Sequence, residues 1–288
     1  MSRLSNARAR PNNAVPRQAT LRESIRFEGI GLHTGEHARV EVRPAPADDG
    51  IVFVLGQTRV PATVDYVVDT SRATVIGREG ATVSTTEHLL SALFAMGVSN
   101  VEILVDGPEI PARDGSSAEF VAAIRRSGLT SQDKLRADLA LEAPVWIRSG
   151  DRMIAAVPSD EFRVRFVADF PPPVGTEYLD IAIEPEEYER EIAGARTFAY
   201  LNEIEALWAR GLGRGGSLEN ALVFTPDGPM QALRWPNEPV RHKVLDLVGD
   251  LALVGAWPHC EIVAIKSGHE LHAALARALR AGARVLSA

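Results

Sequence analysis

The sequence has little cysteine, no long apolar run and no excess of positive charge. Its 288 residues include one cysteine, Cys260, so the chain can form no intrachain disulfide and needs no oxidising compartment. The longest apolar stretch, residues 245–257, contains Asp246 and Asp250, which argues against a membrane-spanning segment. The net charge of −7 is opposite in sign to that of a typical nucleic-acid-binding protein. These absences are compatible with a reducing compartment, and the balance of 45% hydrophobic and 24% charged residues is that of a soluble globular protein.

The N-terminal segment is the one strongly basic part of the chain. The first 22 residues contain five arginines and no acidic residue, and they lack the apolar core of a signal peptide. We expect a disordered basic tail over residues 1–19, with organelle targeting or binding to anionic lipid as the alternative. The remaining length suits two domains of ordinary size.

Hydrophobic periodicity divides the chain into two similar halves. Two predicted helices with a strand between them occur in the first half, at residues 87–96, 100–105 and 117–126, and again in the second, at residues 239–254, 260–266 and 270–281. We therefore expect an α+β fold of two similar domains, residues 20–128 and 139–288, joined by a polar linker over 129–138. A glycine-bounded insert at residues 199–216 interrupts the second domain.

Shorter patterns predict the remaining elements. Strand-like patterns occur at residues 20–26, 37–43, 51–54, 62–67, 73–76, 139–148, 153–157 and 163–170, and the pattern at 37–43 alternates between apolar and charged side chains. Two further helices are predicted at residues 185–191 and 202–210. Mixed helix and strand of this kind is typical of layered α+β domains.

Residues 239–250 predict a helix on which His242, Asp246 and Asp250 follow one another at intervals of four residues. Pro239 suits the first helical turn. One apolar stripe is formed by Val240, Val244 and Val248. His242 and Asp246 are four residues apart, so their side chains lie one above the other, as two metal ligands on one helix must. Asp250 continues the row. A solvated helix face with an i,i+4 His–Asp pair is the alternative interpretation of this spacing.

The segment at residues 84–88 has two interpretations. Ser84 and Glu87 form an S-x-x-E capping box, and His88 would then be a histidine satisfied within the core. In the functional interpretation His88 is a third metal ligand, and Glu87 is the adjacent general base for water. His269 follows a predicted strand and a glycine, where it either starts a helix or donates a proton to a leaving amine.

Taken together, the motifs resemble those of one family. They occur in order from about residue 20 to residue 281, as Gly29-Ile30-Gly31-Leu32-His33-Thr34-Gly35, Arg43-Pro44-Ala45-Pro46-Ala47, Ser84-Thr85-Thr86-Glu87-His88-Leu89, Glu109-Ile110-Pro111, Asp114-Gly115-Ser116, Ala195-Arg196-Thr197-Phe198, Gly215-Gly216-Ser217, Arg241-His242-Lys243 with Asp246, Gly249 and Asp250, and Lys266-Ser267-Gly268-His269. The chain resembles the UDP-3-O-acyl-N-acetylglucosamine deacetylases of Gram-negative lipid A synthesis. The resemblance implies two α+β domains whose helices are sandwiched between outer sheets.

The resemblance also implies a metal-dependent hydrolysis. The N-acetyl group of UDP-3-O-acyl-N-acetylglucosamine would be removed as acetate, leaving UDP-3-O-acyl-glucosamine, in the cytoplasm. His88, His242 and Asp246 would bind Zn²⁺ and leave one position open, which is the pattern of catalytic zinc sites. An Fe²⁺ ion could occupy a similar ligand set.

By the same resemblance, five residues have catalytic roles. Glu87 would be the general base and His269 the general acid. Asp250 would orient His269 and raise its pKa. Thr197 and Lys243 match residues that stabilise the oxyanion or contact substrate near the metal.

A further set of positions matches substrate contacts. Phe198 and the insert would form an apolar passage for the acyl chain, while Arg196, Lys266 and Phe170 would contact the nucleotide-sugar. Departures from the family pattern occur at Pro172, Arg152, Arg214 and Tyr200. The partner implied is a small acylated UDP-sugar, with no nucleic acid and no integral membrane segment, and the resemblance suggests a monomer.

Two rival functions remain open from the residues alone. One is a non-catalytic protein that binds a nucleotide-sugar or lipid and holds a structural metal. The other is a metal-dependent phosphoesterase, which would usually use two metal ions and more carboxylates. Restoration of activity by Zn²⁺ after chelation would separate an enzyme from the binding protein.

Overall fold

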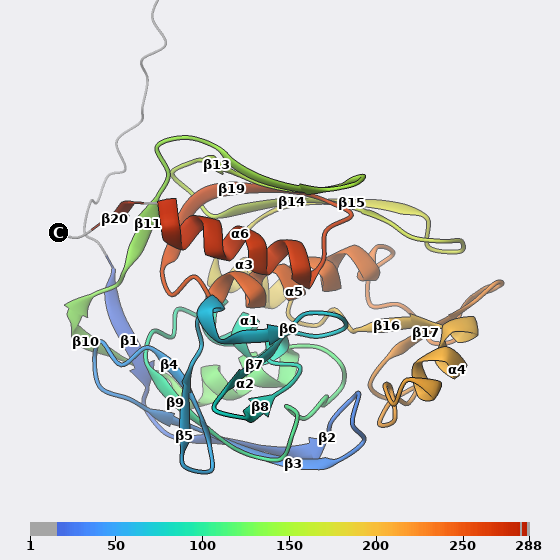
Figure 1. Cartoon of the computed structure of the whole chain (residues 1–288), viewed down its shortest axis with the longest axis horizontal. Coiled ribbons are helices and arrows are strands. Elements are labelled where there is room, and N and C mark those ends of the chain that lie inside the picture. The colour runs from blue at the N-terminus through green and yellow to red at the C-terminus, as the bar shows by residue number, and fades with distance from the viewer. Residues whose placement is uncertain (1–15, 283, 287–288) are drawn as a thin grey trace, which may run out of the picture.

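Two β-sheets form the outer faces of the molecule, and helices fill the space between them (Figure 1). This computed structural model describes residues 16–282 and 284–286. A smaller lobe, made of short strands and one helix, projects from one end of the layers (Figure 1). The predicted α+β fold with helices between outer sheets is confirmed.

The first half of the chain builds the sheet at the bottom of Figure 1. Its five strands lie in the order β2-β3-β9-β4-β5. The strand bounds are β2 Ile25–Ile30, β3 His37–Pro44, β4 Ile51–Leu55, β5 Thr58–Pro61 and β9 Val101–Asp106. A short 3-10 helix η1, Val64–Tyr66, leads to a small sheet of β6 Val67–Asp69, β7 Val75–Arg78 and β8 Ala81–Val83. The helices of this half are α1 Glu87–Ala95 and α2 Ala118–Ser127.

The second half builds the opposite sheet, which has seven strands. Their bounds are β11 Asp138–Ala140, β12 Val145–Ser149, β13 Arg152–Pro158, β14 Arg163–Asp169, β15 Thr176–Ala182, β19 Trp257–Ile265 and β20 Arg284–Leu286. Its helices are α3 Pro185–Glu191, α5 Glu238–Ala252 and α6 His269–Gly282. The projecting lobe holds β16 Phe198–Tyr200, α4 Leu201–Ala209, β17 Leu222–Thr225 and β18 Gly228–Pro229.

The five strands of the first sheet have counterparts with the same pairing in the second sheet, which adds β11 and β20. In the first, β9 pairs antiparallel with β3 and parallel with β4, and each partner continues into an antiparallel neighbour. In the second, β19 pairs antiparallel with β13 and parallel with β14, which again continue into β12 and β15. Helices α1 and α5 precede the equivalent central strands, and α2 and α6 follow them. The repeat expected from helix and strand order is therefore present in the strand pairing.

Helices α1 and α5 pack against each other in the centre of the molecule. Every residue of α1 is buried, and the apolar stripe of α5, including Val240, Val244 and Val248, is fully buried as well. Burial of such side chains contributes roughly 1.5–3 kcal/mol each. Gly249 allows the close approach, because a Cβ at that position would overlap the backbone carbonyl of Glu87. The equivalent helices of the two halves thus meet backbone to backbone at Glu87.

Some sequence-based boundaries differ from the structure. Residues 62–67 are predicted as a strand, but Val64–Tyr66 form η1 and Val67 begins β6, because the Thr63 N–H donates to the Pro61 carbonyl and the chain turns there. The predicted strand at 139–148 is split into β11 and β12 around Pro144, since proline removes a ladder donor. The polar linker segment contains β10, Leu129–Leu135, whose residues pair with β1, Arg17–Leu21. The tail boundary at residue 19 thus falls inside β1, and residues 1–15 of that predicted tail lie outside the described part of the chain.

No helix in residues 16–282 is both long and apolar enough to cross a lipid bilayer.

Candidate metal and catalytic site

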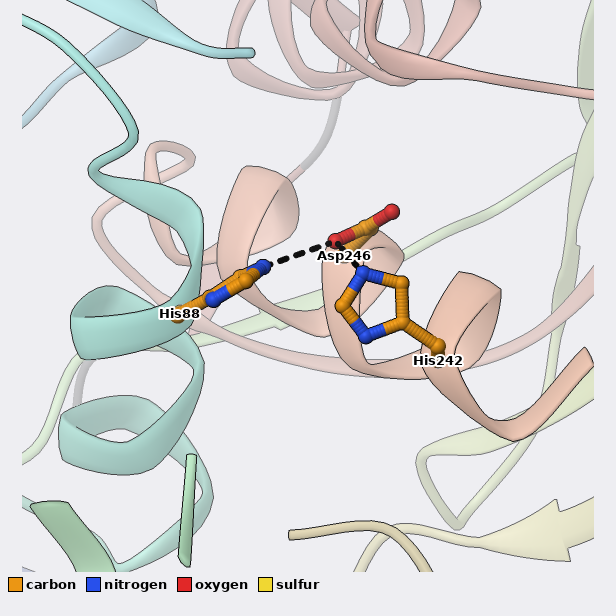
Figure 2. Close-up of side chains that lie close together, drawn as sticks. All are labelled: His88, His242 and Asp246. Atoms are coloured by element: carbon orange, nitrogen blue, oxygen red, sulfur yellow. Dashed lines mark ion pairs between the residues drawn. The ribbon is translucent and has the colours of Figure 1, made fainter. Parts of the chain in front are cut away.

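The contact between α1 and α5 brings together side chains that are far apart in sequence. His88 lies in the first turn of α1, and His242 and Asp246 lie one turn apart on α5 (Figure 2). All three residues are at most 5% exposed. The alternative of a solvated helix face for His242 and Asp246 is therefore wrong, and the spacing of four residues directs both side chains toward α1.

The three side chains converge on one point. Asp246 Oδ1 lies 3.6 Å from His88 Nε2 and 3.4 Å from His242 Nε2. The two imidazole rings are nearly perpendicular, with centroids 5.0 Å apart. Four ligands arranged tetrahedrally at bond lengths of about 2.1 Å would be roughly 3.4 Å from one another. The two distances to Asp246 Oδ1 fit that spacing, and both are longer than a hydrogen bond.

The hydrogen bonds around these residues leave the converging atoms free. His242 Nδ1 lies 3.1 Å from the Ala195 carbonyl, which can only accept, so Nδ1 carries the proton and Nε2 keeps its lone pair. Burial lowers the pKa of His242 to about 3, so the neutral imidazole is the favoured form. Lys243 Nζ donates to Asp246 Oδ2 over 2.6 Å. Asp246 Oδ1 is buried without a hydrogen-bond partner among the described residues.

This donor set fits a metal ion. A buried carboxylate oxygen without a partner is costly in a protein interior, whereas a cation between it and the two imidazole nitrogens would satisfy all three groups. Two histidine nitrogens and one carboxylate oxygen are a known ligand combination of catalytic Zn²⁺. His88, His242 and Asp246 form one of three groups among the described residues that could hold an ion; the others are Asp250, His269 and His272, and Glu87, Asp246 and His269.

Glu87 lies beside this cluster at the start of α1. Its carboxylate is 3% exposed, and Oε2 accepts a hydrogen bond from the backbone N–H of Thr74 over 3.1 Å. Burial raises the pKa of Glu87 to about 6, against the opposing charges of His269 and His88. The capping-box interpretation of Ser84 and Glu87 is wrong, because α1 begins at Glu87 itself and Thr86 has no side-chain cap.

Opposite Glu87, His269 begins α6 and is held by Asp250. His269 Nδ1 lies 2.8 Å from Asp250 Oδ2, and its Nε2 faces Glu87 Oε1 at 3.8 Å. Burial by itself would lower the pKa of His269, but the carboxylates of Asp250 and Glu87 outweigh it and raise the pKa to about 9. Asp250 therefore favours the charged imidazolium and sets its orientation.

The Asp250 carboxylate has two further partners. His272 Nδ1 lies 2.7 Å from the same Oδ2 atom, and the Thr74 hydroxyl donates to Oδ1. Burial would raise the pKa of Asp250, yet the contacts with His269 and His272 hold it at about 2. Since Thr74 donates its backbone N–H to Glu87 and its hydroxyl to Asp250, one residue links the two ionisable centres.

A cavity of about 580 Å³ opens onto these groups. The polar end is lined by Glu87, His88, Thr197, His242, Lys243, Asp246 and His269. The opposite side is apolar and is formed by the insert and its surroundings, including Phe170, Phe198, Leu201, Ile204, Leu207, Trp208 and Val223. Phe198 joins the two parts, because its ring lies 5.1 Å from that of Phe170 and 6.3 Å from the His242 imidazole, centroid to centroid.

Two residues predicted to contact substrate lie away from the cavity lining. Arg196 is paired with the buried Glu238, with Nε 2.8 Å from Oε1, and also donates to the Ala232 carbonyl. Lys266 Nζ lies 2.7 Å from Asp169 and 3.0 Å from Asp151. Their assignment to the nucleotide-sugar remains a sequence prediction. A single sequence does not reveal that Arg196 and Lys266 already have charged partners, because those partners are distant along the chain.

Other cavity residues received no role from the sequence. His33 lines the cavity from the glycine-rich turn, and burial lowers its pKa. Arg72 lines the cavity from the loop between β6 and β7. Thr74 and His272 both contact the Asp250 carboxylate, which in turn contacts His269. The glycine-rich motif was a signal for His33, whereas nothing in the local sequence distinguishes Arg72 or Thr74.

Comparison with known proteins assigns the chain to one family. Residues 18–281 match the family model described as UDP-3-O-acyl N-acetylglycosamine deacetylase. A protein named UDP-3-O-acyl-N-acetylglucosamine deacetylase from Anaeromyxobacter sp. is 45% identical, over 90% of this chain and 87% of its own length. Proteins of the same name from Syntrophotalea carbinolica and Nostoc sp. are each 43% identical, over 88% and 92% of this chain and 85% and 99% of their own lengths. The chain therefore belongs to the UDP-3-O-acyl N-acetylglycosamine deacetylase family.

Proposed function

We propose that this protein is a zinc-dependent amidase that removes the N-acetyl group of UDP-3-O-acyl-N-acetylglucosamine, releasing acetate and UDP-3-O-acyl-glucosamine for lipid A biosynthesis in the cytoplasm. The observation that supports it most directly is the partnerless Asp246 Oδ1 between two histidine nitrogens, beside Glu87 and His269. The family assignment supports the same reaction. A monomer with a domain division near residues 129–138 completes the proposal.

His88, His242 and Asp246 would hold the ion. Zn²⁺ bound there would polarise the amide carbonyl and lower the pKa of a bound water toward ~7. The protein orients these ligands through contacts behind them. The Ala195 carbonyl fixes the His242 tautomer, and Lys243 leaves only one Asp246 oxygen available. Such supporting contacts typically affect metal affinity by 10- to 100-fold.

Glu87 and His269 divide the proton transfers. Glu87, held by the Thr74 N–H, accepts a proton as water attacks the acetyl carbonyl. His269, charged through its contact with Asp250, donates a proton to the departing amine. Over one turnover Glu87 gains one proton and His269 loses one, so transfer of a proton from Glu87 to His269 would restore both residues. Both groups would lie beside the same reacting carbon, because Glu87 Oε1 and His269 Nε2 are only 3.8 Å apart.

Thr197 and Lys243 line the polar end of the cavity. The Thr197 backbone is held on both sides, since its N–H donates to the Gly115 carbonyl over 2.8 Å and its carbonyl accepts from Leu222 N over 2.8 Å. A rigid hydroxyl and an ammonium next to the reaction centre would stabilise negative charge as it develops on the acetyl oxygen.

The apolar part of the cavity would take the 3-O-acyl chain. Phe198 and the lobe built from β16, α4 and β17 line it, and the ring contacts among Phe198, Phe170 and Phe224 keep this wall rigid. Burial of acyl methylenes against it would contribute roughly 0.8 kcal/mol each. The nucleotide would then lie outside this wall, where Phe170, Arg196 and Lys266 are the predicted contacts.

The test is an assay of acetate release from UDP-3-O-acyl-N-acetylglucosamine, with metal content measured on the same samples. We expect turnover that is lost on chelation and restored by Zn²⁺. A binding protein with a structural metal would release no acetate at any metal loading. A phosphoesterase would release phosphate or UMP instead. Either outcome would refute the proposal.

A further inference from the structure

Glu109 is a fully buried carboxylate outside the helices and large sheets. Its exposed fraction is 0%, and it lies between β9 and α2 at the junction of two other segments. An isolated bridge pairs Glu109 with Ser84, just before α1, and another pairs Pro111 with Gly31 in the glycine-rich turn. Three motifs that are separate in the sequence therefore meet at this side chain.

Glu109 acts only as an acceptor in its hydrogen bonds, and both of its carboxylate oxygens are used. Oε2 accepts from the Thr34 N–H and the Thr34 hydroxyl, each over 2.8 Å. Oε1 accepts from the Thr85 hydroxyl over 2.6 Å and from the His33 N–H over 3.0 Å. A backbone N–H group cannot act as an acceptor, and one such group faces each carboxylate oxygen of Glu109. A side-chain amide at this position would therefore turn its NH₂ group toward another donor. The site requires an acceptor on both sides.

The Glu109 carboxylate is closely packed against its neighbours. A Cβ on Gly31 would overlap the Glu109 carboxylate, which explains glycine at that position. Thr85 has φ of +57°, a backbone conformation that side chains with Cβ branching rarely adopt. Its hydroxyl bond to Glu109 compensates for that conformation. Because Thr85 comes two residues before Glu87, the same bond sets how the chain enters α1.

The opposite side of the turn holds the end of the insert. The Leu32 carbonyl accepts from Gly215 N over 3.1 Å, and the His33 carbonyl accepts from Arg214 N over 3.2 Å. A Cβ on Gly215 would overlap the Gly31 carbonyl, so this contact is close along its length. Leu32 and His33 also line the cavity. One turn therefore connects Glu109 on one side with the apolar lobe on the other.

We infer that Glu109 is a positioning residue for the deacetylation: it holds the entry to α1, the turn at residues 31–35 and the end of the insert in one arrangement, so that the acyl-binding wall is set relative to Glu87. This inference rests on the proposed function for the reaction, but its structural part does not. Displacement of the wall by about 1 Å would be enough to cost up to ~10²-fold in rate.

The experiment compares Glu109→Gln with a matched control, Asp138→Asn. Asp138 is also buried, at 4% exposed, and is paired with Arg136 and His259 at a place outside the cavity lining. For each zinc-loaded protein, kcat/KM is measured with the acylated substrate and with UDP-N-acetylglucosamine, which lacks the acyl chain. Hydrogen exchange of the backbone amides is followed by mass spectrometry in peptides covering residues 30–36 and 211–218.

For Glu109→Gln we expect zinc binding to persist and kcat/KM for the acylated substrate to fall roughly 10- to 100-fold. The preference for the acylated over the unacylated substrate should shrink, and exchange should accelerate in both peptides. Asp138→Asn should lose thermal stability while keeping its acyl preference and its exchange in both peptides.

An acyl preference within threefold of the unmodified protein, or unchanged exchange in either peptide, would overturn the inference, as would equal changes in the control. Absence of acetate release by the unmodified protein would instead refute the proposed function, and the exchange data would still decide whether Glu109 holds the turn and the insert together.

Discussion

His269 Nε2 faces Glu87 Oε1 at 3.8 Å. Thr74 donates its backbone N–H to Glu87 and its hydroxyl to Asp250, and Asp250 in turn contacts His269. The pair comes from different halves of the chain, α1 and the start of α6. Burial raises the pKa of Glu87 to about 6, while Asp250 and Glu87 outweigh burial and raise the pKa of His269 to about 9. Between these values Glu87 is a carboxylate and His269 an imidazolium.

These pKa values predict a bell-shaped dependence of kcat/KM on pH. A general base works above its pKa and a general acid below its pKa, so activity should rise through pH 6, remain high and fall through pH 9. The measurement is a pH–rate profile at saturating zinc. Replacement of Asp250 by asparagine should move the falling limb to lower pH, because it removes the carboxylate that favours the imidazolium. A profile that keeps rising beyond pH 10 would contradict the assignment of His269 as the acid.

Removal of either residue that we propose to transfer protons should lower turnover without removing the metal. Glu87→Ala and His269→Ala should each reduce kcat by roughly 10²- to 10⁴-fold. His37→Ala is a suitable control, because His37 is exposed at the start of β3 and outside the cavity lining. Near-normal kcat in both variants, with zinc still bound, would show that other groups carry the protons.

His242→Ala should instead strip the metal. The substitution removes one proposed ligand and leaves the Ala195 carbonyl without the Nδ1–H donor of His242. We expect zinc content well below one ion per chain after dialysis, measured by elemental analysis, together with loss of acetate release. Full zinc occupancy in this variant would place the ion elsewhere.

Gly249→Ala should disturb the site through the helix contact alone. The added methyl group would overlap the Glu87 carbonyl, so α5 must move away from α1. Overpacking of this kind typically costs about 1–3 kcal/mol, and we expect a lower melting temperature together with weaker zinc binding. Gly282→Ala, at the end of α6 where a Cβ meets open space, is the matched control. Equal melting temperatures in the two variants would mean that the contact is not as close as described.

The acyl wall can be tested on α4, which has no buried residue of its own. Ile204 lines the cavity and Ala206 does not. Ile204→Asp should lower kcat/KM for the acylated substrate by at least about tenfold and leave that for the unacylated substrate nearly unchanged, because a charge in this wall opposes burial of methylenes. Ala206→Asp should change neither. Equal losses for both substrates with Ile204→Asp would argue that the acyl chain lies elsewhere.

Local sequence patterns predicted most of the central elements. The helix at 87–96 and that at 239–254 were confirmed to within two residues at each end, because long apolar stripes and Pro239 leave few alternatives. The repeat of helix, strand and helix was also recovered. The short strands β16, β17 and β18 were missed, since two to four residues carry no detectable periodicity.

The residues of the candidate site divide in the same way. His242 and Asp246 share one helix, so their spacing indicated a common direction. Their convergence with His88 depends on how α1 crosses α5, which Gly249 permits and which no local pattern contains. Glu109 is a clearer case, because its five hydrogen bonds come from four donor groups of residues 33, 34 and 85, which lie far from it along the chain. Arg196 is the opposite case: the sequence predicted a substrate contact, but the side chain is paired with Glu238, 42 residues away.

The most direct test of the account is anomalous diffraction at the zinc absorption edge from crystals of the zinc-loaded protein. We predict one strong peak, about 2.0–2.2 Å from His88 Nε2, His242 Nε2 and Asp246 Oδ1. A peak centred on Asp250, His269 and His272 instead, or no peak between α1 and α5, would contradict the account.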